Sequence, residues 1–316
     1  MPRRYLNTTA RDTRAPFVTR FVAFLLSLAL CLTAGCGKKT ETSVASAGQV
    51  ERPAVESDES AAAQLRRSAA GVLDKGDLKL SYQTRKGFRS GDAARRAGDD
   101  SQALQKIVAD LNERIALPYD IGVSFKDCEE PDAFYDNEAH QVTLCYQLID
   151  EYYDLFSRKV KDRATLDDVV RGAAASTLFH EFGHALVDAW QLPITGREED
   201  AVDQFSTLVL VNETEDGERM ALHGALAFER YADLGKGHEQ ILWDEHSLDG
   251  QRFYDTICLI YGSDPEKYTY LVADRTLPAE RAEMCREDYP RASRSWRQLL
   301  RPYLKQPPSD AAPGER

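Results

Sequence analysis

The chain has 316 residues, of which 42% are hydrophobic and 29% are charged, and its formal net charge at pH 7 is −12. This composition suits a globular protein of one or two domains with a substantial hydrophobic core. The acidic balance argues against binding to nucleic acid and against electrostatic binding to anionic lipid. Charge and composition indicate little more about function.

The N-terminus has the pattern of an export signal. Five arginines precede the apolar run FVAFLLSLALCL at 21–32, which is too short to span a bilayer as a mature helix. Residues 32–36 read LTAGC and resemble a bacterial lipobox, with Thr33 in place of the usual leucine. We predict a lipoprotein signal peptide at 1–35 and a lipid anchor on Cys36; an ordinary signal peptide is the alternative. Losing five arginines and one aspartate would change the net charge from −12 to −16.

Composition divides the remaining chain into a fold and two flexible ends. Residues 36–75 are rich in Ser, Ala and Glu and predict a tether, whereas 305–316 predict a disordered tail. The folded domain is expected at 76–304. Gly37 follows the lipidated cysteine where a sorting aspartate would stand, which favours a periplasm-facing lipoprotein of the outer membrane in the cell envelope.

Hydrophobic periodicity predicts both strands and helices in this domain. Strands are expected at 78–83, 119–125 and 141–148, and helices at 101–117, 149–160 and 198–211. A T-x-x-D capping pattern at Thr165 predicts the start of a further helix of about 25 residues, which Pro193 and Gly196 end. The pattern favours an α+β domain, with a small mixed or antiparallel sheet packed on long helices.

The predicted long helix carries the sequence HEFGH at 180–184. Side chains four residues apart lie about 40° apart around a helix, so His180 and His184 can reach one ion at about 2 Å. Glu181 points to the side, where it can hydrogen-bond a water on the open metal position. We therefore predict a Zn²⁺ cofactor on the two histidines, with Glu181 as general base.

A third protein ligand is expected from the next helix, where Glu198, Glu199, Asp200 and Asp203 are candidates. Glu199 and Asp203 are four residues apart, so one carboxylate can bind the metal while the other holds an imidazole N–H. Glu198 has Val202 at that offset, which cannot do this. Glu199 is therefore the predicted ligand, Asp203 its supporting carboxylate, and Glu198 the second choice.

Four cysteines remain beyond the predicted lipid anchor: Cys128, Cys145, Cys258 and Cys285. In an oxidising compartment they favour two disulfides, with three possible connectivities. We favour Cys128–Cys145 and Cys258–Cys285, because each pair is local and flanks a plausible hairpin or helix pair. Buried free thiols are the alternative, and no C-x-x-C spacing supports a cysteine zinc site.

Three stretches resemble a bacterial metallopeptidase family first described as a domain of unknown function: LPYDIGVSFKDCEEPDAFYDNEAHQVTLCYQLI, TLFHEFGHALVDAWQLPITGREEDAVDQFS and WDEHSLDGQRFYDTICLIYGSDPEKY. The resemblance covers about 76–304 and implies a zincin fold with a glutamate ligand, as in gluzincins. His246 and Arg252 are similar to the H-P-x-x-x-x-R stretch of prenyl-protein endopeptidases, with Ser247 replacing the proline. That likeness implies that His246 stabilises the oxyanion; a surface histidine is the alternative.

The leading hypothesis is a monomeric, lipid-anchored zinc peptidase that hydrolyses a peptide or protein substrate and binds no nucleic acid. The strand at 141–148 is expected to bind an extended substrate as an added strand. The alternatives are a binding lipoprotein that keeps the zincin fold without catalysis, and a scaffold for other envelope proteins. Glu181 discriminates between them, because a structural metal site has no use for a base there.

Overall fold

The computed structural model describes residues 74–83, 101–213 and 216–305. The predicted signal peptide, Cys36, almost all of the predicted tether and the tail beyond 305 lie outside these ranges. The first and last described residues meet, because Lys305 Nζ lies 2.5 Å from Asp74 Oδ2. Within the described ranges, none of the helices combines the length and the apolar composition that crossing a bilayer requires.

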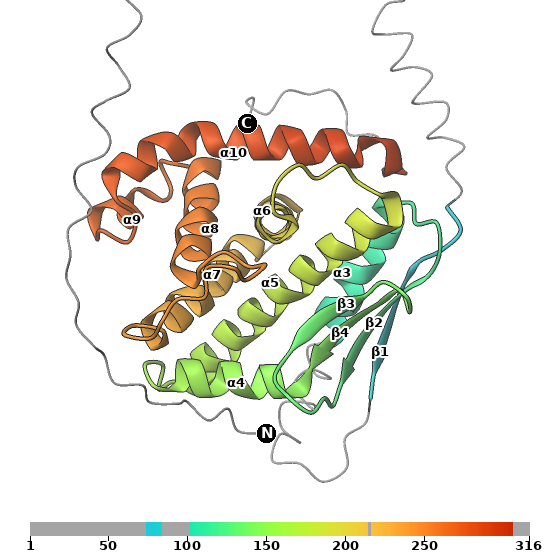
Figure 1. Cartoon of the computed structure of the whole chain (residues 1–316), viewed down its shortest axis with the longest axis horizontal. Coiled ribbons are helices and arrows are strands. Elements are labelled where there is room, and N and C mark those ends of the chain that lie inside the picture. The colour runs from blue at the N-terminus through green and yellow to red at the C-terminus, as the bar shows by residue number, and fades with distance from the viewer. Residues whose placement is uncertain (1–73, 84–100, 214–215, 306–316) are drawn as a thin grey trace, which may run out of the picture. The chain divides into compact units, whose positions relative to one another are not determined.

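The described strands form one mixed sheet in the order β1-β2-β4-β3 (Figure 1). Strands β1 (Leu78–Tyr82), β2 (Ile121–Lys126) and β4 (Gln141–Cys145) are parallel to one another, and β3 (Ala133–Asp136) pairs antiparallel with β4 at the edge. Strand β4 is buried on both faces, as expected for an inner strand covered by helices. The sequence pattern predicted these three strands but not their parallel pairing, and it missed β3.

The predicted strand at 141–148 is too long. Strand β4 ends at Cys145, and α4 (Tyr146–Ser157) begins at the next residue. Tyr146 and Leu148 fit the two-residue alternation of the strand, but Leu148 also shares a buried helical face with Tyr152, four residues further on, while Tyr146 is buried in the main core. The two periodicities therefore overlap at this junction, and the helix takes these residues.

The helices enclose α5 (Arg163–Trp190), which lies between the sheet and the C-terminal helices in Figure 1. The C-terminal helices are α6 (Glu198–Glu213), α7 (Gly217–Leu234), α8 (Asp249–Ser263), α9 (Thr269–Ala273) and α10 (Ala279–Leu300). The 3₁₀ turn η1 (Arg301–Tyr303) follows them. Helix α10 packs on α8, and α3 (Ser101–Arg114) packs on β1. The predicted α+β, zincin-like architecture is confirmed.

Helix α5 begins two residues before the predicted cap. Asp162 is the N-cap, and its Oδ2 accepts hydrogen bonds from the backbone N of Thr165 at 2.8 Å and from its hydroxyl at 2.7 Å. Thr165 is thus the third residue of the helix and not its cap. An aspartate at this place satisfies an amide that has no partner within the helix, and its negative charge suits the helix N-terminus.

Both favoured disulfides are present. Cys128–Cys145 joins the segment after β2 to the end of β4, and Cys258–Cys285 joins α8 to α10. The second pair is buried in the main hydrophobic core together with Trp296 and Phe205. Each bond closes a short loop, which reduces the entropy of the unfolded chain.

Candidate metal centre

Helices α5 and α6 approach closely because Gly183 has no side chain. A Cβ added there would meet Val202 Cβ at 2.8 Å and Phe205 Cδ1 at 3.1 Å. Gly183 lies within the HEFGH sequence, and Val202 lies one turn along α6 from Glu198 and Glu199. The contact therefore sets the acidic first turn of α6 opposite the histidines.

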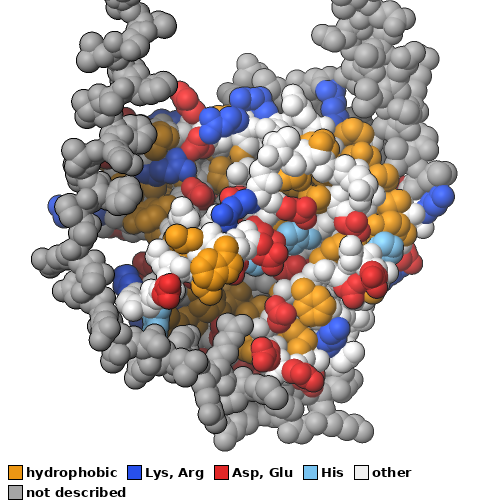
Figure 2. All heavy atoms as spheres, in the orientation of Figure 1, with side chains coloured by type: hydrophobic (Ala, Val, Ile, Leu, Met, Phe, Trp, Pro, Cys, Tyr) orange, Lys and Arg blue, Asp and Glu red, His pale blue; other side chains and the backbone are white. Residues whose placement is uncertain are grey.

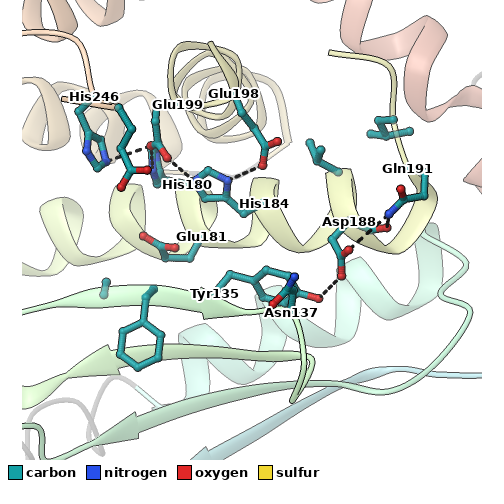
Figure 3. Close-up of a pocket in the computed structure, with 15 residues that line it drawn as sticks. Tyr135, Asn137, His180, Glu181, His184, Asp188, Gln191, Glu198, Glu199 and His246 are labelled. Carbon is teal, nitrogen blue, oxygen red and sulfur yellow. Dashed lines mark hydrogen bonds and ion pairs between the residues drawn. The ribbon is translucent and has the colours of Figure 1, made fainter. Parts of the chain in front are cut away.

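The two histidines and Glu199 converge on one point (Figure 3). His180 Nε2 lies 3.0 Å from Glu199 Oε2, and His184 Nε2 lies 3.3 Å from Glu199 Oε1. One ligand atom from each side chain lies within 4.8 Å of the others. Glu199 Oε2 is buried and has no hydrogen bond of normal geometry, despite the nearby imidazole nitrogens. Two imidazoles and an unsatisfied buried carboxylate fit a divalent metal ion.

A separate carboxylate holds the other nitrogen of each imidazole. His180 Nδ1 lies 2.8 Å from Asp203 Oδ1, and His184 Nδ1 lies 2.8 Å from Glu198 Oε1. Such bonds place the proton on Nδ1 and leave Nε2 free to bind metal. The structure thus sets Asp203 where it was expected. Glu198, the second choice as ligand, bonds to the far side of His184 instead.

Arg252, on α8, extends this network. Its Nε and Nη2 donate to the two carboxylate oxygens of Asp203 at 2.7 and 2.8 Å, and its guanidinium stacks over Phe228 at 4.2 Å. Burial raises the pKa of Asp203, but the bonds to Arg252 and His180 outweigh this effect and lower it to about 2. Asp203 therefore stays ionised and keeps its charge beside His180.

Glu181 lies between the candidate ligands and β3 in Figure 3. Its side chain lines the cleft, is only 7% exposed, and forms no hydrogen bond with another described residue. Burial raises the pKa of this carboxyl, and the nearby His180 and His184 oppose the shift. A buried carboxylate with a raised pKa, facing a cleft, has the properties of a proton acceptor.

His246 also reaches the centre, from the loop before α8. Its Nε2 lies 3.0 Å from Glu199 Oε2. The loop is held in place because the backbone N of His246 donates to Asp244 Oδ1 at 2.9 Å, and Arg197 Nη1 donates to the carbonyl of His246 at 3.2 Å. Ser247 stands where the similar motif has proline, and it donates to Asp200 Oδ1 at 2.6 Å. His246 is thus part of the cluster and not an isolated surface side chain.

The centre opens into a cleft of about 600 Å³ between α5 and β3. Tyr135 on β3 donates to Asp188 Oδ2 at 2.9 Å and joins the two walls. The sequence reasoning missed both residues, although Asp188 follows His184 by four residues and so continues the face of His180 and His184. The expectation that 141–148 receives an extended substrate is wrong, because β4 is paired on both sides and β3 forms the edge.

The fold and this cluster define a zincin-like candidate metallopeptidase. Residues 89–300 match the family described as "Putative metallopeptidase" (DUF4344). The match covers more than half of the chain, and the protein belongs to this family. No curated protein and no solved structure showed significant similarity to the chain.

Proposed function

We propose that the protein is a zinc peptidase in which His180, His184 and Glu199 bind the metal. The observation that carries this proposal is the convergence of two Nε2 atoms and a buried, unsatisfied carboxylate oxygen, with a carboxylate behind each imidazole. Two histidines and one glutamate form a ligand set typical of catalytic zinc, which leaves a further coordination position open.

Zinc bound at this point would lower the pKa of a water molecule and polarise a peptide carbonyl. Glu181 would accept the proton of the attacking water on its carboxylate and pass it to the leaving amine. Its burial supports this role, because burial raises the pKa of this carboxyl and so makes it a stronger proton acceptor. His246 would donate from Nε2 to the carbonyl oxygen as negative charge develops there.

Strand β3 is the proposed platform for the peptide. Its outer edge has no neighbouring strand among the described residues, and Ala133, Phe134 and Tyr135 line the cleft beside Glu181. An extended peptide could add to such an edge through backbone hydrogen bonds, which would hold its scissile carbonyl beside the metal. This role replaces the one first expected for β4.

We further propose that the enzyme acts in the cell envelope, anchored through a lipid on Cys36. The support is the N-terminal pattern of arginines, apolar run and LTAGC. The disulfides add support, because such bonds persist mainly in oxidising compartments.

Comparison of the wild type with Glu181→Gln tests the proposed chemistry. The variant keeps the shape of the side chain and all three ligands, so it should bind zinc with the wild-type stoichiometry. It should cleave a general peptide library on the order of 10²- to 10⁴-fold more slowly, because the base is lost. Glu283→Gln, an exposed position on α10, is the matched control. Equal cleavage by wild type and Glu181→Gln would refute the role of Glu181 as base, whereas no cleavage by either protein would favour the non-catalytic binding lipoprotein.

A further inference from the structure

The cleft around the candidate metal has strongly acidic walls. It consists of two adjoining cavities of about 600 and 570 Å³, which share His184, Glu198, Glu199 and Glu245. Among the described residues lining them, one is basic, Arg197, and six are acidic: Glu181, Asp188, Glu198, Glu199, Asp244 and Glu245. With a divalent ion bound and the histidines neutral, six negative charges, one positive charge and the two charges of the ion give −3. Figure 2 shows acidic side chains gathered around the histidines on this face.

Arg197 offsets only one of these negative charges and forms no ion pair with them among the described residues. Its Nη1 donates to the backbone carbonyls of Asp244 and His246 at 3.4 and 3.2 Å, so it is engaged in holding the loop. Asp244 in turn bonds to the backbone N of His246, and Glu198 bonds to His184 while its side chain stays 46% exposed. Carboxylate oxygens thus remain available at the second cavity.

An unpacked aromatic side chain stands beside these acids. Trp243 lines the second cavity, and 83% of its surface is exposed. A lysine or arginine side chain can lay its methylenes and its cationic group on an indole face. Trp243 next to Glu198 and Glu245 therefore offers both the apolar surface and the negative charge that such a side chain requires.

Glu181 independently indicates that this cleft receives a ligand. Its side chain is 7% exposed, points into the cleft and has no hydrogen-bond partner among the described residues. Glu181 lines the first cavity, which shares His184, Glu198, Glu199 and Glu245 with the cavity beside Trp243, so a ligand that contacts Glu181 would lie next to both.

We propose that the cleft selects peptides carrying a lysine or arginine close to the scissile bond, and that Trp243, Glu198 and Glu245 bind this cationic side chain. The inference rests on the proposed peptidase function and adds a substrate class to it. Acidic peptides are disfavoured at the same position, because like charges repel across the cleft.

Quenched fluorescent peptides test this selectivity on the zinc-loaded protein. The peptides consist of alanine except at one position, which is Lys, Gln or Glu, and this position is moved along the peptide from one set to the next. At one position, kcat/KM for Lys should exceed that for Gln by about tenfold, and Glu should be the poorest. Trp243→Ala and Glu245→Gln should each reduce the Lys-to-Gln ratio by roughly threefold or more, whereas Glu283→Gln should not change it. Equal kcat/KM for the three residues at every position would overturn the proposal.

Binding to zinc-loaded Glu181→Gln separates the two proposals. The same peptides, labelled for fluorescence anisotropy, should bind about tenfold more tightly with Lys than with Gln. Cleavage by the wild type without any preference would refute the cationic site and leave the peptidase standing. Preferential binding of Lys peptides without any cleavage would support the site and refute the peptidase. Neither cleavage nor preference would refute both.

Discussion

Arg252 donates two hydrogen bonds to Asp203, through Nε at 2.7 Å and Nη2 at 2.8 Å, while Asp203 Oδ1 lies 2.8 Å from His180 Nδ1. Three side chains from α8, α6 and α5 thus form one chain of charged hydrogen bonds that ends on an imidazole. The planar guanidinium fixes the plane of the carboxylate, and the carboxylate fixes the ring of His180. His180 is therefore oriented before a metal binds.

Asp203→Asn should weaken zinc binding by about 10- to 100-fold, because the substitution removes the charge that supports His180. The amide keeps the size of the side chain but leaves Arg252 without its ionised partner. Competition with a chromophoric chelator measures the affinity. Asp110→Asn, at an exposed position on α3, makes the same chemical change away from the centre and should bind zinc as the wild type does. An unchanged affinity in Asp203→Asn would show that this network does not support the ligand.

Glu199→Ala and Glu198→Ala should differ sharply in their effect on zinc binding. The first removes a proposed ligand and should abolish stoichiometric binding at micromolar protein. The second removes only the carboxylate behind His184 and should lower the affinity by roughly tenfold. Metal content after dialysis distinguishes them. The reverse order would make Glu198 the ligand and would contradict the geometry described above.

Gly183→Ala should destabilise the protein and weaken zinc binding. Alanine normally favours a helix over glycine by about 1 kcal/mol. Here the new Cβ would meet Val202 Cβ at 2.8 Å, so α6 must shift, and we expect a loss of about 1–3 kcal/mol in the free energy of unfolding. Gly250→Ala is the matched control, because a Cβ there meets nothing within 4 Å. Urea unfolding and chelator competition, run on both variants, check this. A Gly183→Ala protein as stable as the control would rule out the tight contact.

Zinc binding should release protons at pH 7. Burial lowers the pKa of His180 in the metal-free protein, but the bonds to Asp203 and Glu199 outweigh it and raise the pKa to about 9. A raised pKa means that the proton is bound below pH 9, and a ligating imidazole must lose it. The apparent zinc affinity should therefore increase as the pH rises toward 9 and fall in acid. Calorimetry in two buffers of different ionisation enthalpy measures the release. A pH-independent affinity without proton release would contradict this prediction.

The core of the site could be predicted from the sequence, because residue spacing along a helix determines which side chains share a face. The four-residue spacing of His180 and His184 places both rings on one face, and the same spacing relates Glu199 to Asp203. The structure brings these four residues together as that spacing predicts. The disulfide pairs were also predictable, because each joins cysteines that lie close in sequence.

The remaining features depend on how distant segments are placed, which periodicity does not reveal. Strand β3 has four residues and exists through its pairing with β4, so its sequence AFYD gives little signal. Glu198 reaches His184 only because Gly183 and Val202 fix the separation of the two helices. Thr165 had the residue type of a cap, but Asp162 accepts a hydrogen bond from the backbone N of Thr165, so the helix begins earlier and Thr165 lies in its first turn.

The most direct test of the central claim is the anomalous difference map of a zinc-soaked crystal, measured above and below the zinc absorption edge. The account predicts one strong peak about 2.0–2.2 Å from Nε2 of His180, Nε2 of His184 and a carboxylate oxygen of Glu199, with Glu181 facing the open side. A peak bound by other side chains, or no peak between the two histidines at saturating zinc, would contradict it.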